Sequence, residues 1–174
     1  MTAFTLDSVF GTKWTYQGQI KAVCFDLFKT LVDVGQVPDS VGRFTTDILG
    51  VDRLLWREAC FGPNHNIREP TDPFETLLKL ARSLKPDISI DLVQQAMIER
   101  QFRFDYALTH VDKDILRSLQ SIRNRNFRTG LIFNASSSEI SAWPQSPLAE
   151  LFDVATFSCE CGHEKPEFQY TKRH

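Results

Sequence analysis

The 174-residue sequence has few cysteines, no long apolar run and no excess of charge of either sign. Four cysteines in a chain of this length do not indicate a disulfide framework, so we expect a reducing, cytoplasmic location. No apolar stretch approaches the roughly 20 residues needed to cross a bilayer, and the first residues lack the features of a signal peptide. The net charge of −2 gives no reason to expect nucleic acid or an anionic membrane as a partner.

The most informative segment is residues 20–32, with the sequence IKAVCFDLFKTLV. Its first six residues are apolar or β-branched, apart from Lys21, and predict a strand buried on both faces, as in a parallel sheet. The predicted strand ends at Asp26. Ligands of open α/β sheets bind beyond the carboxyl ends of the strands, so Asp26 is a candidate nucleophile. An ordinary turn or helix-capping aspartate is the alternative, and this segment alone leaves both open.

Two later segments also have the apolar and β-branched pattern that predicts a strand. Residues 127–136 (FRTGLIFNAS) predict a second strand that enters a polar turn, and residues 151–158 predict a third. A helix with an apolar inner stripe is predicted from Asp112 to about Arg125. The order of strand, helices, strand, helix and strand predicts a doubly wound, Rossmann-like α/β core around a parallel sheet.

Residues 33–108 form a different part of the sequence, because helical periodicity replaces the strand patterns there. Apolar residues at helical spacing predict helices that start at Pro38 to Ser40, after Gly50 at residues 51–56, and at Asp72-Pro73, and a further helix capped by Ser89 or Asp91. We therefore expect two parts in the chain. Residues 1–32 and 109–174 are predicted to form the α/β core, and residues 33–108 an all-helical insertion.

Three motifs follow one another between residues 20 and 166: strand-Asp-x-x-x-Thr-Leu, strand-Asn-x-Ser and Gly-x-x-Lys-Pro. In this order they resemble the haloacid dehalogenase (HAD) superfamily of hydrolases. The resemblance implies that Asp26 is a covalent nucleophile, that Thr30 supports its loop and that Lys165 is the family's lysine. It also implies that the helical insertion is a cap that covers the site and excludes water, which strengthens electrostatic interactions.

The chemistry of these residue types agrees with those roles. A carboxylate can attack an electrophilic carbon or phosphorus and form an ester or acyl phosphate, which divides one difficult step into two. An ammonium group near Asp26 would keep the carboxylate ionised and offset charge on the substrate. A solvated loop lysine is the alternative for Lys165.

The sequence departs from the family pattern at several catalytic positions. Phosphatases of the family have a second aspartate two residues after the nucleophile, where this chain has Phe28, which cannot transfer a proton. Lys29 replaces a usual glycine, and Phe133 replaces the serine or threonine at the end of the second strand. Asn134, Ser136 or Ser137 would have to bind the substrate instead, although their backbone register differs from the family's by at least one residue. Phe28 favours a dehalogenase-like reaction at carbon over phosphatase activity.

The family continues after its lysine motif with a further strand and an acidic motif that holds Mg²⁺, whereas this sequence stops eight residues after Pro166. The resemblance makes Mg²⁺ possible, but its oxygen shell would be incomplete, and no residue is assigned as a metal ligand. Without the further strand, residues 20–25 would form an exposed edge that tends to pair with another chain. We therefore expect a fragment, a homodimer or complementing chain, or an N-terminal arm packed along this edge.

Two hypotheses follow from the sequence. The first is a HAD-like hydrolase, possibly impaired, that acts on a small molecule through Asp26. The second is an inactive member of the fold that acts by binding a partner chain. An arginine of the helical insertion could bind a substrate carboxylate in a bidentate manner, but the sequence does not choose among the candidates Arg43, Arg53, Arg57 and Arg68.

Overall fold

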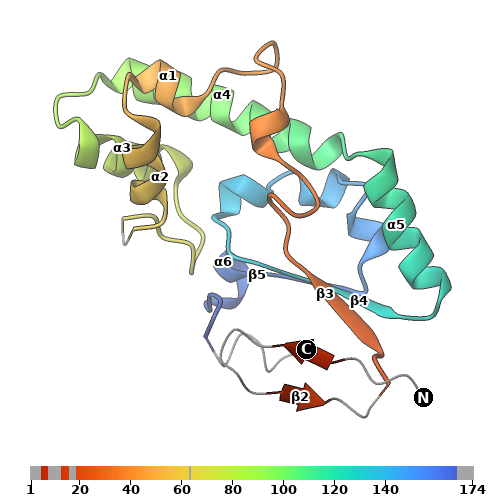
Figure 1. Cartoon of the computed structure of the whole chain (residues 1–174). Helices are drawn as coiled ribbons and strands as arrows, with labels where there is room; N and C mark the ends of the chain where they lie inside the picture. Colours follow the sequence, from red (N-terminus) through yellow and green to blue (C-terminus); the bar gives the residue numbers. More distant parts are fainter. Residues whose placement is uncertain (1–4, 8–12, 16–18, 63, 168–174) are drawn as a thin grey trace.

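The structure is a computed structural model that describes residues 5–7, 13–15, 19–62 and 64–167 (Figure 1). Strands β3 (Ala22–Phe25), β4 (Arg128–Phe133) and β5 (Val154–Phe157) form a parallel sheet in the order β3-β4-β5. Helices accompany this sheet, so the predicted α/β class with a Rossmann-like core is confirmed. No helix in the described part of the chain has the length and apolar character needed to span a membrane.

Strand β3 lies at the edge of the three-stranded sheet, as expected, but it is not buried on both faces. Val23 and Phe25 are half-buried, whereas Ala22 and Cys24 are exposed and Ile20 retains 57% of its accessible surface. The register aligns Cys24 with Gly130 and Val154, and Val154 is also exposed. The prediction of a doubly buried strand is therefore wrong, because only the opposite face of the described sheet is covered.

The N-terminal arm contains two short strands, β1 (Thr5–Asp7) and β2 (Lys13–Thr15). They pair with each other in an antiparallel sheet of their own and do not add a strand to the parallel sheet. The remaining residues of the arm lie outside the described part of the chain.

The predicted helix starts are largely confirmed by their capping contacts. Asp52 accepts hydrogen bonds from two backbone N–H groups of α2, Asp72 accepts one from α3, and Asp112 accepts one from α5. The helix expected from Pro38 begins only at Thr45, and residues 149–151 form one turn of 3₁₀ helix. The helices are α1 (Thr45–Leu49), α2 (Arg53–Cys60), α3 (Pro73–Leu84), α4 (Ile90–Thr109), α5 (Lys113–Asn124) and α6 (Ser158–Cys161), with 3₁₀ turns η1 (Val34–Gln36), η2 (Ser137–Ile140), η3 (Trp143–Gln145) and η4 (Ala149–Leu151).

Two clusters of buried apolar side chains hold these elements together. The first packs against the sheet and includes Leu27, Leu131 and Phe157. The second lies within residues 33–108, which we call the helical region, and joins α1, α3 and α4. The long helix α4 belongs to both clusters, because it places Val93 in the second and Leu108 in the first.

The buried face of α4 differs from the predicted one. Helical periodicity in the sequence places Val93, Met97, Ile98 and Phe102 on one side of this helix, but Ile98 and Phe102 are 44% and 53% exposed. Arg103 is buried instead, with 2% exposure. Its guanidinium lies over the ring of Phe44 and donates four hydrogen bonds of 2.6 to 3.5 Å to the segment that follows the Asp26 loop: to Gly42 O, Val34 O, Val37 O and Asp39 Oδ1.

Candidate functional site

Asp26 and Lys165 meet where the strands end, although 139 positions separate them in the sequence. Lys165 Nζ lies 2.6 Å from Asp26 Oδ1 and donates a second hydrogen bond of 2.7 Å to the carbonyl of Ile132. The lysine and aspartate side chains are 33% and 40% exposed. The expected pairing of carboxylate and ammonium is thus present, and solvent can still reach both groups.

Asn134 holds the backbone of Lys165 in place. Its Oδ1 accepts a 2.8 Å hydrogen bond from the Lys165 N–H, and its Nδ2 donates a 3.1 Å bond to the Lys165 carbonyl. Both ends of the Asn134 amide are therefore used within the protein. This geometry suits a residue that positions Lys165, whereas the sequence led us to expect one that binds substrate.

Thr30 lies beside the other oxygen of Asp26, with its Oγ1 3.5 Å from Asp26 Oδ2. The intervening loop is closed by backbone hydrogen bonds from Leu31 and Val32 to the carbonyl of Leu27. Lys29 has a left-handed backbone with φ of 65°, a conformation in which a side chain is disfavoured. The loop thus needs the backbone freedom that glycine would give at this position.

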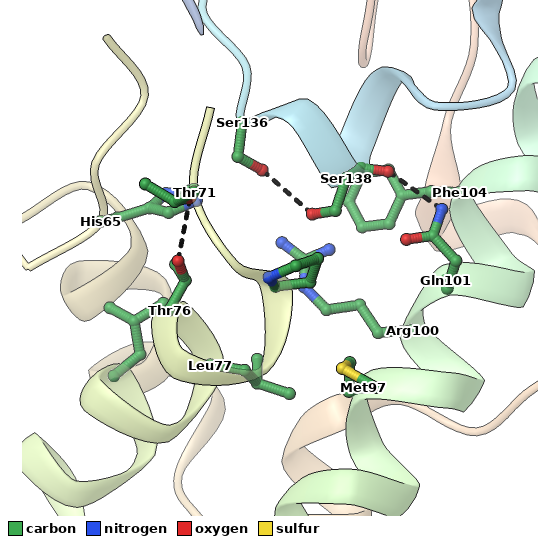
Figure 2. Close-up of a pocket in the computed structure, with 12 residues that line it drawn as sticks. His65, Thr71, Thr76, Leu77, Met97, Arg100, Gln101, Phe104, Ser136 and Ser138 are labelled. Carbon is green, nitrogen blue, oxygen red and sulfur yellow. Dashed lines mark hydrogen bonds between the residues drawn. The ribbon is translucent and has the colours of Figure 1, made fainter. Parts of the chain in front are cut away.

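Ser136 does not join this group. It is buried, its Oγ lies 3.3 Å from Ser138 Oγ, and its backbone N–H donates to Glu139. Figure 2 shows Ser136 and Ser138 beside Arg100 at a small cavity of about 20 Å³ between η2 and the helical region. Neither Asp26 nor Lys165 lines this cavity.

Arg100, which lines the cavity, forms an ion pair that the sequence did not reveal. Arg100 Nη2 lies 2.7 Å from Glu139 Oε1, and the guanidinium packs over the ring of Phe104. Burial alone would raise the pKa of Glu139, but the charges of Arg100 and His65 and the Ser136 N–H outweigh it and lower that pKa. Arg100 could have been suspected, because positions 93, 96, 100, 103 and 107 recur at the spacing of one helix face.

This ion pair should make folding sensitive to acid. The pKa of Glu139 is lower in the folded state than in the unfolded state. Its ionised carboxylate therefore contributes fully to the free energy of unfolding at pH values above the unfolded-state pKa, and this contribution is lost as the pH falls through the folded-state pKa. We expect Glu139→Gln to cost about 3 kcal/mol at neutral pH, and to cost less below about pH 4. Urea unfolding from pH 3 to 7, with exposed Glu150→Gln as control, measures this. An equal loss at every pH would contradict it.

Aromatic rings pack around Phe28, two residues after Asp26. The ring of Phe28 makes edge contacts with Phe104 and Phe133, at centroid distances of 5.1 and 5.0 Å.

Phe104 also borders a cavity of about 180 Å³ next to Arg100, and a third, open cavity of about 640 Å³ lies along α3. None of these three cavities is lined by Asp26 or Lys165.

The groups around Asp26 do not fit a magnesium site. Mg²⁺ takes a near-octahedral shell of oxygen atoms, whereas the nearest partner of the Asp26 carboxylate is an ammonium group. Within residues 19–62 and 64–167, no three His, Cys, Asp or Glu side chains are grouped in a way that could hold a metal ion. We therefore derive no step through a metal.

The four candidate arginines of the helical region mostly pair with carboxylates of the chain itself. Arg43 pairs with Glu99 at 2.9 Å and Arg53 with Asp47 at 3.1 Å, while Arg57 lies 6.0 Å from the ring centroid of Phe61. Arg68 reaches the loop that carries Lys165. It is the one of the four that contacts the neighbourhood of the site.

No family model and no curated protein matches the chain. Sixteen chains of solved structures do match, among them a crystal structure of a dehalogenase. That structure superposes with a TM-score of 0.55 over 88% of this chain and 69% of the dehalogenase chain, at 17% sequence identity. The chain shares its fold with that structure. At this identity the likeness concerns the fold, and an activity must be argued from the site itself.

Proposed function

We propose that the chain is a hydrolase of the haloacid dehalogenase type that acts on a small molecule with Asp26 as its nucleophile. The observation that carries this proposal is the 2.6 Å contact between Asp26 and Lys165 at the carboxyl ends of parallel strands. The ammonium group of Lys165 holds Oδ1 of Asp26, and Oδ2, which lies 3.5 Å from Thr30 Oγ1, remains available for attack.

In the first step, Asp26 Oδ2 attacks the carbon that carries the leaving group. A carbon–oxygen bond forms, the carbon–halogen bond breaks, and the halide leaves with the electron pair. In the second step, water attacks the carbonyl carbon of the aspartyl ester, which releases the alcohol and a proton and restores the carboxylate. Lys165 offsets negative charge in both steps.

The leaving group is inferred from Phe28. An alkoxide leaving group requires a proton from an acid, and the ring of Phe28, packed against Phe104 and Phe133, cannot supply one. A halide leaves without protonation. The substrate class proposed is therefore a small halogenated carbon compound, and a phosphate monoester is disfavoured.

A substrate panel tests this proposal. We expect halide release from 2-chloro- or 2-bromo-carboxylates and no phosphate release from monoesters. In a single turnover in H₂¹⁸O with enzyme in excess, the product hydroxyl should carry ordinary oxygen, because that oxygen comes from Asp26. If the product of this single turnover contains ¹⁸O in its new hydroxyl, or if phosphate esters are turned over faster than the haloacids, the proposal is overturned.

A second candidate function is binding without turnover, with a second copy or a complementing chain paired to the edge of β3. It is supported by the position of β3 at the edge of the described sheet and by Asp26, which lines none of the three cavities described above. It predicts a dimer or complex in light scattering and no turnover on the panel. A monomer that releases halide would remove it.

A further inference from the structure

Arg68 connects the helical region to the loop that carries the site lysine. It lies between α2 and α3, and its Nη2 contacts Glu164 Oε1 at 2.6 Å and Glu167 Oε1 at 2.7 Å. The two glutamates are the neighbours of Lys165 and Pro166 in sequence. One guanidinium therefore holds both ends of the four-residue turn from Glu164 to Glu167.

The turn itself is closed by its own hydrogen bonds. The Glu167 N–H donates to the Glu164 carbonyl at 2.8 Å, and Glu167 Oε2 lies 3.4 Å from both the Glu164 N–H and His163 Nδ1. Asn134 holds the Lys165 backbone from the side of the sheet. Lys165 is thus fixed by two independent attachments, one from the end of strand β4 and one from the helical region.

We propose that Arg68 is a positioning residue, which holds the Glu164–Glu167 turn so that the Lys165 ammonium stays on Asp26. Its effect on turnover rests on the proposed function, whereas its effect on Lys165 does not. Because the Arg68 side chain is 48% exposed and the glutamates 32% and 36%, these ion pairs add little to global stability. They affect the local position of the Lys165 side chain, which can be measured separately from global stability.

The first test measures the amine of Lys165 directly. The full chain is treated with an acetylating ester, and acetylation at each lysine is followed by mass spectrometry. In Arg68→Gln we expect Lys165 to react about fivefold faster, a shift typical of the loss of exposed ion pairs. The double variant Glu164→Gln/Glu167→Gln should show the same increase, and Arg68→Lys, which keeps the charge, should show a smaller one.

Arg53→Gln is the matched control, because it breaks an exposed arginine–aspartate pair of the helical region that does not touch the turn. It should leave acetylation of Lys165 unchanged. Equal rates at Lys165 in Arg68→Gln and the native chain would overturn the proposal. So would a similar increase in Arg53→Gln, since the effect would then reflect a general loosening of the helical region.

The second test uses turnover, if the substrate panel finds any. Arg68→Gln should lower kcat about tenfold and leave KM nearly unchanged, because a misplaced Lys165 affects charge in the reaction more than substrate binding. Unchanged kcat together with faster acetylation would overturn the link to catalysis. Absence of turnover in the native chain would count against the proposed function, and the acetylation experiment would still decide the role of Arg68.

Discussion

Replacing Asp26 with asparagine is expected to reduce halide release by at least about a thousandfold, because an amide is not a competent nucleophile. The substitution is nearly isosteric and the side chain is 40% exposed, so the fold should be retained. The amide oxygen introduced by Asp26→Asn could still accept a hydrogen bond from Lys165. The loss should therefore appear in kcat, with a melting temperature close to that of the native chain.

Steady-state halide release and thermal unfolding of the same preparations measure this effect. Asp87→Asn is a suitable control, because Asp87 is an exposed aspartate between α3 and α4, far in sequence from the strand ends. It should keep full activity. Retention of more than about a tenth of the native rate by Asp26→Asn would show that another group attacks the substrate.

Replacing Arg103 with methionine is expected to cost about 3 to 5 kcal/mol of unfolding free energy, which makes it the most destabilising change we anticipate. Methionine keeps much of the apolar stem, but it leaves three backbone carbonyls at Val34, Val37 and Gly42 without their donor. For a chain of this size, the melting temperature should fall by about 10 °C.

Urea and thermal unfolding measure the loss, and Arg53→Met provides the control. Arg53 and Asp47 form a pair whose side chains are 68% and 50% exposed, so its removal should cost less than about 1 kcal/mol. Arg103→Lys should fall in between, because a single ammonium cannot replace a planar group with several donors. An Arg103→Met protein as stable as the native chain would contradict this view of the segment.

The parts of the structure that follow from local patterns were predictable. Asp52, Asp72 and Asp112 cap helices where the sequence indicated them, and Asp26 and Lys165 meet because carboxyl ends of parallel strands share one edge of a sheet. Long-range arrangements were not predictable. The exposed face of β3 depends on which elements cover the sheet, and no pattern within residues 20–25 records that.

The inner face of α4 shows a second limit. Hydrophobic periodicity favours Ile98 and Phe102 on that face, whereas the helix buries Arg103 and pairs Arg100 with Glu139. Arginine is rarely buried, so a pattern based on hydrophobicity excludes it unless its partners are known. The partners here are backbone carbonyls and a glutamate from distant segments. Ser136 was expected near Asp26 because it follows the end of β4, but it borders a cavity that Asp26 does not line.

The continuity of α4 restricts how a substrate could enter. Its 20 residues run without interruption from the apolar cluster of the helical region to the cluster beside the sheet. Arg103 of α4 also hydrogen-bonds the segment from Val34 to Gly42, which leads from the sheet into the helical region. The chain passes between the sheet and the helical region twice, and both of these connections are therefore held by α4. A rigid movement of the helical region away from the sheet would have to bend α4 or break the hydrogen bonds of Arg103, whereas movement of the loop around Arg68 would break only partly exposed ion pairs.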